Sequence, residues 1–235
     1  MEDAMVSQSE CEFYHSMDLP QVGSISGYWD LRGRFADYIA HTPIEGRTFL
    51  DVGTATGFLS FEAEKCGASV TSFDADGPER YEYVPGNTSY DPASYLRLRN
   101  GYTFSHELLG SKANLILGDI YSMSQRVQPH DVVLVGQILV HLRDPLSALQ
   151  QAAAASRDIL IITEGSFESD LPVSVFLGGE SPYSWWHLST GVYRTYLDLL
   201  GFDITSVTKG QYTCLHKDNL GEVDLWTFVA KRRPL

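Results

Sequence analysis

Short apolar runs, each closed by an acidic or small residue, constrain the fold of this sequence more than any other feature. Continuous apolar runs without alternation are typical of strands buried on both faces, as in a parallel sheet. Helical patterns lie between several of these runs, and this alternation predicts a doubly wound α/β fold. The predicted strands are Thr48–Val52, Ser69–Phe73, Asn114–Leu117, Val132–Val135 and Ile159–Thr163, and the predicted helices are 31–40, 57–66, 102–109, 145–155 and 192–200.

The chain is of ordinary length for one domain, and we expect residues 1–235 to form a single unit. Two late segments, Asp203–Thr208 and Val223–Ala230, are typical of a terminal strand pair. Residues 1–30 form an aromatic and polar leader, and residues 165–188 are rich in Gly, Pro and Ser. Because loops at the carboxyl ends of strands form the ligand crevice of doubly wound folds, we expect 165–188 to act as a lid.

A glycine turn follows the first predicted strand. The stretch Phe49–Gly57 reads F-L-D-V-G-T-A-T-G, so Gly53 and Gly57 are separated by three residues. Glycine permits a sharp turn and a close approach of ligand and helix N-terminus. The spacing differs from the dinucleotide fingerprint G-x-G-x-x-G, although a nucleotide-dependent oxidoreductase stays open as an alternative.

The stretch D-x-G-x-x-x-G after an apolar strand resembles motif I of class I S-adenosylmethionine-dependent methyltransferases. Asp74 closes the second strand and Asp119 follows the third, in the order that this family shows. The resemblance implies a Rossmann-like α/β fold, with a doubly wound, mostly parallel seven-stranded sheet and an antiparallel terminal strand. It also implies S-adenosyl-L-methionine as the cofactor.

In this family the acid after the second strand binds the two ribose hydroxyls, and the acid after the third accepts from the adenine amino group. A cation before the first strand, here Arg32, suits the methionine carboxylate, and Tyr28 could bind the same group. Ala55 stands where the family usually has Gly, which strains the turn if this residue needs a positive φ. The implied cofactor residues are Tyr28, Arg32, Asp51, Gly53, Thr54, Gly57, Asp74, Asp119, Ile120 and Gln137.

Methyl transfer is mainly a matter of positioning, and a histidine near neutral pH is the natural base for a hydroxyl acceptor. His141 after the fourth strand is the first candidate and His15 in the leader the second; His141 could instead pack beneath the following helix. Aromatic residues around 165–188 could line the acceptor pocket or seal a hydrophobic patch or a dimer face. The predicted acceptor-binding residues are Tyr14, Trp185, Trp186 and His187.

The leader stretches Phe13–Pro20 and Gly27–Arg32 resemble a bacterial methyltransferase group related to the enzyme that modifies the tRNA wobble uridine. A net charge of −13 disfavours a nucleic-acid partner, because polyanions are repelled. We therefore expect methylation of a hydroxyl or amine on a small molecule. A tRNA-modifying enzyme and a non-catalytic cofactor-binding protein stay open as alternatives.

Three widely spaced cysteines and seven histidines without ligand spacing predict neither a disulfide framework nor a metal site. No run approaches the roughly 18 apolar residues that a membrane span needs. The first twelve residues carry acids and no Lys or Arg, unlike the basic start of a signal peptide. A cytoplasmic protein that acts on a small molecule, with a homodimer as an open option, is the resulting expectation.

Overall fold

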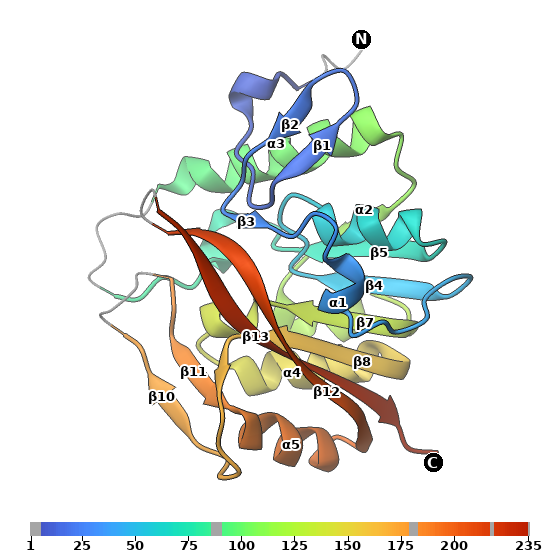
Figure 1. Cartoon of the computed structure of the whole chain (residues 1–235), viewed down its shortest axis with the longest axis vertical. Helices are drawn as coiled ribbons and strands as arrows, with labels where there is room; N and C mark the ends of the chain where they lie inside the picture. The colour runs from blue at the N-terminus through green and yellow to red at the C-terminus, as the bar shows by residue number, and fades with distance from the viewer. Residues whose placement is uncertain (1–5, 86–90, 179–182, 217–218, 235) are drawn as a thin grey trace.

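The computed structural model describes residues 6–85, 91–178, 183–216 and 219–234, and its centre is an eight-stranded sheet (Figure 1). The strand order is β3-β12-β13-β8-β7-β4-β5-β6, with β4 to β8 parallel and β13 antiparallel to both of its neighbours. The strands are β3 (Trp29–Asp30), β4 (Thr48–Val52), β5 (Ser69–Asp74), β6 (Asn114–Leu117), β7 (His130–Gly136), β8 (Ser156–Glu164), β12 (Phe202–His216) and β13 (Asn219–Arg232). The predicted doubly wound sheet with an antiparallel terminal strand is confirmed.

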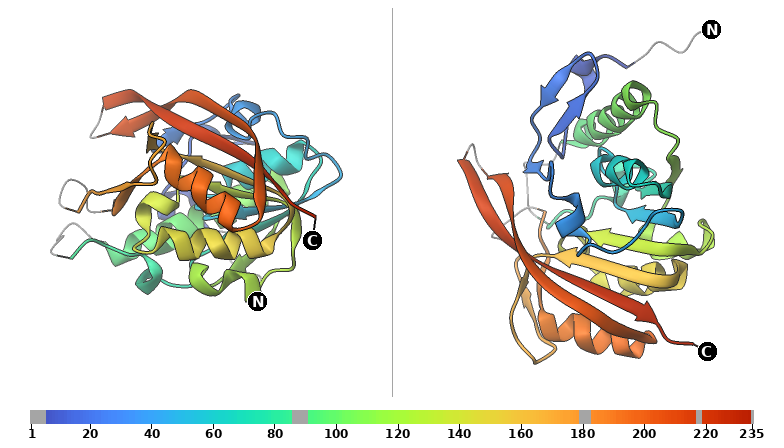
Figure 2. Two further views of the ribbon diagram at one scale, coloured as in Figure 1. Left: turned by 90° about the horizontal axis from the view of Figure 1, so that it is seen from below. Right: turned by 45° about the vertical axis from the view of Figure 1, so that its right-hand side comes forward.

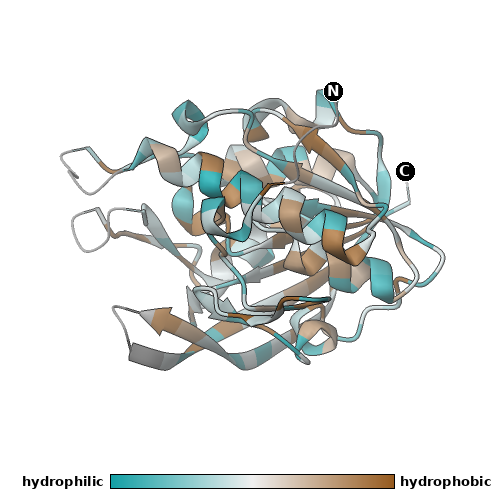
Figure 3. Ribbon diagram, turned by 90° about the horizontal axis from the view of Figure 1, so that it is seen from above, coloured by the Kyte–Doolittle hydropathy of each residue, from teal (hydrophilic) through white to brown (hydrophobic). Residues whose placement is uncertain are grey.

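Successive residues of the central strands belong to two separate apolar cores, one on each face of the sheet. Phe49 packs with the leader and with α1, α2 and α3, whereas Leu50 packs with α4 and α5. This arrangement explains why the strands lack polar alternation. Figures 2 and 3 show the helices flanking the sheet and the hydrophobic colour along its strands. The helices are α1 (Phe35–Tyr38), α2 (Phe58–Lys65), α3 (Pro92–Leu109), α4 (Pro145–Ala155) and α5 (Thr190–Leu199).

The leader adds the eighth strand, which was not predicted. Its strands β1 (Met17–Leu19) and β2 (Gly23–Ile25) form an antiparallel hairpin, and β3 then pairs with β12 at the edge of the main sheet. The pairing of β3 is only two residues long, so no sequence pattern marks it. The leader is thus part of the fold rather than a loose extension.

Several predicted elements differ in extent. The terminal strands β12 and β13 have 15 and 14 residues and so run well beyond the predicted 203–208 and 223–230. Helix α3 begins ten residues before the predicted start at Tyr102, because Pro92 occupies the first helical turn and the Asp91 side chain accepts from the Ala93 N–H. Helix α1 has four residues, since Ala40 and His41 have positive φ of 48° and 55° and end it early.

The stretch 165–188, which was predicted to act as a lid, carries strands of its own. A parallel pair links β9 (Ser166–Phe167) to β11 (Trp186–Ser189), and β10 (Ser174–Phe176) pairs with β11 from the other side. A short 3-10 helix, η1 (Gln8–Glu10), precedes β1, and three more lie in connections: η2 (Pro78–Arg80), η3 (Ile120–Gln125) and η4 (Leu139–His141). Within the described ranges, no helix is both long and apolar enough to cross a membrane.

Candidate functional site

The glycine turn joins β4 to α2 through three residues with positive φ. These are Gly53 at 77°, Ala55 at 49° and Gly57 at 89°. A Cβ on Gly53 would lie 2.6 Å from Ile138 Cδ1, and one on Gly57 would lie 2.5 Å from the Phe61 ring. Ala55 takes the left-handed conformation despite its methyl group, which costs roughly 1–2 kcal/mol. Side-chain size and backbone conformation therefore both require the two glycines.

A buried polar network anchors this turn from below. The Ser60 hydroxyl of α2 donates to the Asp51 carboxylate at 2.7 Å and lies 3.0 Å from the Thr54 hydroxyl and 2.7 Å from the Ser72 hydroxyl. The Tyr102 hydroxyl donates to Ser72 at 3.0 Å. Burial raises the pKa of Asp51 to about 6, and the hydroxyl donors oppose this shift. Asp51 thus ties β4, β5, α2 and α3 together beneath the turn.

Asp74 at the end of β5 faces the turn. Its carboxylate accepts from the Ala55 N–H and from the Ala75 N–H, each at 2.7 Å. Burial raises its pKa, while the positive charge of Arg99 and the two backbone donors oppose that rise. A carboxylate has about four lone-pair sites, so Asp74 keeps acceptor capacity for further donors.

Asp119 follows β6 and begins η3. One carboxylate oxygen accepts from the Tyr121 N–H at 2.9 Å, and the other pairs with Arg80 Nη1 at 3.0 Å. Arg80 also pairs with Asp76 at 2.9 Å. Ile120 follows Asp119 as a half-buried residue of η3. The predicted adenine acid therefore already has a cationic partner in the same region.

The ends of β7 and β8 bring Gln137 and Glu164 to the same edge. Gln137 has a φ of 52°, and its buried Nε2 finds no hydrogen-bond partner among the residues that the structure describes. Glu164 is 1% exposed and accepts from the Ile138 and Leu139 N–H groups, each at 2.8 Å. Burial raises the pKa of Glu164 to about 8.

Sequence reasoning missed Glu164. The fifth predicted strand was ended at Thr163, one residue short, although an acid at the end of an apolar strand was the same signal that identified Asp74.

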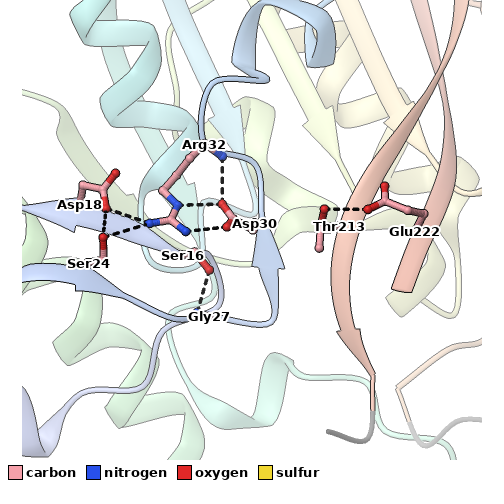
Figure 4. Close-up of polar contacts among 8 residues, drawn as sticks. All are labelled: Ser16, Asp18, Ser24, Gly27, Asp30, Arg32, Thr213 and Glu222. Atoms are coloured by element: carbon pink, nitrogen blue, oxygen red, sulfur yellow. Dashed lines mark hydrogen bonds and ion pairs between the residues drawn. The ribbon is translucent and has the colours of Figure 1, made fainter. Parts of the chain in front are cut away.

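Arg32 and Tyr28 lie in the leader, where both side chains already have partners. Figure 4 shows the Arg32 guanidinium between Asp30, at 2.6 Å, and Asp18, at 2.8 Å. The Tyr28 hydroxyl donates to Glu12 at 3.1 Å, and 46% of Tyr28 is exposed. To bind a methionine carboxylate, Arg32 would have to give up its ion pair with one of these acids. Its role at the cofactor stays a prediction.

The two candidate bases differ in their surroundings. His15 is buried against the Phe58 ring, with a centroid distance of 5.7 Å, and its Nδ1 has no partner among the described residues. Burial lowers its pKa to about 3, so it is neutral. His141 is half-buried, and its Nδ1 lies 2.5 Å from the Tyr183 carbonyl oxygen. Because that carbonyl only accepts, Nδ1 carries the proton and Nε2 is the acceptor.

The predicted acceptor residues lie in two places. Trp185 is buried and donates from Nε1 to the Glu82 carbonyl at 2.5 Å, while Trp186 donates to the Arg143 carbonyl at 2.9 Å. His187 packs edge-on against Phe167 with a centroid distance of 5.3 Å. Tyr14 belongs to the leader, and burial raises its pKa to about 12. The structure brings the two tryptophans to the loops that follow β5 and β7, but Tyr14 packs beside Tyr28 and His15.

Two surface hollows lie away from the strand ends that carry Asp74 and Asp119. One is lined by the leader and α2, with Met17, Arg32 and Phe61 among its walls. The other, of about 370 Å³, lies between α4, α5 and β11 and includes Trp186 and Tyr196. Within residues 6–85, 91–178, 183–216 and 219–234, no group of three or more His, Cys, Asp or Glu side chains is arranged for a metal ion.

Comparisons by sequence find no matching protein-family model and no matching curated protein. Comparison of structures does find similar folds. The N-terminal domain of EvdMO1, determined in the presence of SAH and D-fucose, gives a TM-score of 0.64 at 14% identity, with 96% of this chain and 93% of that one covered.

Two named methyltransferases give TM-scores of 0.55. Magnesium protoporphyrin IX methyltransferase from Synechocystis PCC 6803, with bound SAM, is 16% identical over 85% of this chain and 76% of its own. The 1,6-didemethyltoxoflavin-N1-methyltransferase from Burkholderia thailandensis is 15% identical over 87% and 78%. At these identities the comparison concerns architecture, and the chain shares its Rossmann-like fold with these methyltransferases.

Proposed function

We propose that this chain is an S-adenosylmethionine-dependent methyltransferase that acts on a hydroxyl or amine of a small molecule. One observation carries the proposal: the fold brings the glycine turn, Asp74 and Asp119 to the carboxyl ends of the three adjacent strands β4, β5 and β6. Ligands of doubly wound folds bind at that edge. The structural neighbours crystallised with SAM or SAH support the same cofactor.

The residues at this edge fit the cofactor chemically. Asp74 has spare lone pairs for two vicinal ribose hydroxyls, since its backbone donors use only part of its capacity. Asp119 would accept from the adenine amino group once Arg80 yields one oxygen. The side-chain amide of Gln137, whose Nε2 has no partner among the described residues, supplies a buried hydrogen-bond donor. It follows β7, on the other side of β4 from Asp74. Gly53, Thr54 and Gly57 would bring backbone close to the methionine portion.

The cofactor supplies an electrophilic methyl group on a sulfonium. The protein's contribution is then to position the acceptor and to take a proton from it. His141 suits the proton transfer, because the Tyr183 carbonyl fixes its tautomer and burial lowers its pKa, which keeps Nε2 unprotonated at neutral pH. His15 is a weaker candidate for the base, because it is buried between Phe58 and Tyr14.

Charge supports a small acceptor over RNA. The net charge is −13, and enzymes that bind nucleic acid need basic contacts to phosphate. Several arginines that could have formed such a surface are paired with acids, as Arg97 is with Glu12 and Asp91, and Arg157 is with Asp131. Resemblance of the leader to the wobble-uridine group therefore concerns the scaffold in this proposal. The EvdMO1 domain, determined in the presence of D-fucose, and the toxoflavin enzyme, determined with bound 1,6-didemethyltoxoflavin, support this choice.

Calorimetry with SAM, SAH and NAD tests the cofactor first. We expect SAH and SAM to bind and NAD to give no heat. Transfer of a labelled methyl group to a panel of small hydroxyl and amine compounds, with tRNA as a parallel acceptor, then tests the substrate class. Binding of NAD in place of SAH would overturn the proposal, and labelled tRNA without labelled small molecules would establish the alternative. Tight SAH binding with no acceptor in either panel would favour a non-catalytic cofactor-binding protein.

A further inference from the structure

The segment of residues 76–85, here called the strap, follows β5 and contacts the loops after three other strands. Glu82 makes most of these contacts. Its carboxylate oxygen Oε2 accepts from the Tyr121 hydroxyl at 2.9 Å and from the Arg143 N–H at 2.5 Å. Its carbonyl oxygen accepts from Trp185 Nε1 at 2.5 Å. One residue of the strap thus joins the loops that follow β6, β7 and β8.

The same strap also contacts the proposed cofactor side. Arg80, two residues before Glu82, pairs with Asp119 at 3.0 Å and with Asp76 at 2.9 Å. The Tyr81 ring packs against Tyr95 of α3 with a centroid distance of 5.7 Å. Arg80 and Glu82 therefore connect the acid that is proposed to bind adenine with the loops on the acceptor side.

Arg143, Trp185 and Trp186 form an aromatic wall beyond Glu82. The Arg143 guanidinium lies 5.1 Å from the centroid of the Trp185 ring, and Trp186 donates to the Arg143 carbonyl at 2.9 Å. Glu82 holds both Arg143 and Trp185, by different atoms. Since these links are hydrogen bonds and a cation–π contact rather than buried apolar packing, they can be exchanged at modest cost.

We propose that Glu82 is a positioning residue that transmits occupancy of the cofactor site to the aromatic wall. The proposal rests on the proposed function. Arg80 Nη1 lies against the Asp119 oxygen that the Tyr121 N–H leaves open, and in this proposal the adenine ring takes the place of the guanidinium beside that oxygen. Cofactor binding then displaces Arg80. The strap then moves with Arg80, and Glu82 shifts the wall through Arg143 and Trp185. Cofactor binding therefore precedes and prepares binding of the acceptor.

The coupling can be tested without knowing the acceptor. SAH is added to the protein, and the change in tryptophan fluorescence emission is measured. The chain has four tryptophans, and Trp185 is the one bonded to the strap. We expect SAH to change the emission of the wild type, and Trp185→Phe to remove most of that change. Glu82→Ala removes the carboxylate that accepts from Tyr121 and Arg143. It is expected to bind SAH within about threefold of wild type, a difference under 1 kcal/mol, but to show less than about half of the emission change. Glu79→Ala, an equal truncation on the same strap, should respond like the wild type.

Arg80→Gln provides a second variant at an exposed position, so that a folding failure of the Glu82 variant leaves the test intact. We expect its emission without SAH to resemble that of the SAH-bound wild type, with little further change on binding. A full emission change in both Glu82→Ala and Arg80→Gln would overturn the coupling. Failure of wild-type protein to bind SAH at all would overturn the proposed function instead, and calorimetry distinguishes the two results.

Discussion

Glu164 is the buried carboxyl group at the end of β8, and replacing it with Gln tests whether burial keeps it largely uncharged. Gln retains an oxygen that can accept from the Ile138 and Leu139 N–H groups, but it carries no charge at any pH. The pKa of Glu164 is about 8 in the folded chain against an ordinary 4.5. Because the folded state binds the proton more tightly, the group favours folding below pH 4.5, and this contribution is lost as the pH rises toward 8.

The magnitude follows from the width of that window. Each pH unit inside it changes the free energy of unfolding by at most about 1.4 kcal/mol, so a rise from pH 5 to 8 costs the wild type roughly 2–4 kcal/mol at this site. The Glu164→Gln side chain does not ionise, so the variant does not lose this free energy of unfolding. It should therefore be more stable than the wild type at pH 8. At roughly 2–4 °C per kcal/mol for a chain of this size, its advantage in Tm should be about 5–15 °C at pH 8 and small at pH 5.

Thermal and urea unfolding of both proteins at pH 5 and pH 8 measures the difference. Comparing the variant with the wild type at each pH cancels the titration of groups that they share, such as Asp51 with its pKa of about 6. Glu79→Gln, on the surface, controls for the change in net charge. An equal stability difference at both pH values would refute the reasoning, because it would mean that Glu164 has the same charge at pH 5 and pH 8.

Three further substitutions test the turn and the strand-end acid. Asp74→Asn should weaken SAH binding about 10–150-fold by calorimetry, since a charged acceptor of hydrogen bonds contributes about 1.5–3 kcal/mol, while Asp76→Asn should stay within about threefold. Ala55→Gly should raise the free energy of unfolding in urea by about 0.5–1 kcal/mol, because the relief of left-handed strain exceeds the entropy that Gly adds to the unfolded chain. A loss of stability would contradict the φ of 49°. Gly57→Ala should lower stability by about 2–4 kcal/mol, since its methyl would meet the Phe61 ring, and an unchanged Tm would exclude that contact.

Much of the sheet could be predicted because its signals are local. A buried parallel strand needs a short apolar run, and five such runs gave β4 to β8. The glycine turn and Asp74 could be predicted for the same reason, because each directly follows a strand that its apolar run identifies.

Features that depend on distant partners gave no such signal. The two-residue strand β3 exists because β12 offers it an edge, and the strands of 165–188 depend on one another for pairing. The partners of Arg32 are Asp18 and Asp30 in the folded leader, so its availability could not be judged from its position before β4. Glu82 lies between β5 and α3, outside every predicted strand and helix, and its contacts come from three other loops.

The pairing of β3 with β12 has a consequence for the order in which this chain can fold. Asp30 pairs with Thr213, and Trp29 with Cys214, so the leader meets its edge partner only after more than 180 further residues have been synthesised. Contacts between residues so far apart in sequence close a large loop, and they form late. The parallel strands β4 to β8 can assemble first, while the leader, with Tyr14, His15 and Tyr28, still lacks its strand partner. The leader side of the site is therefore completed after the central sheet, when the β12–β13 hairpin docks.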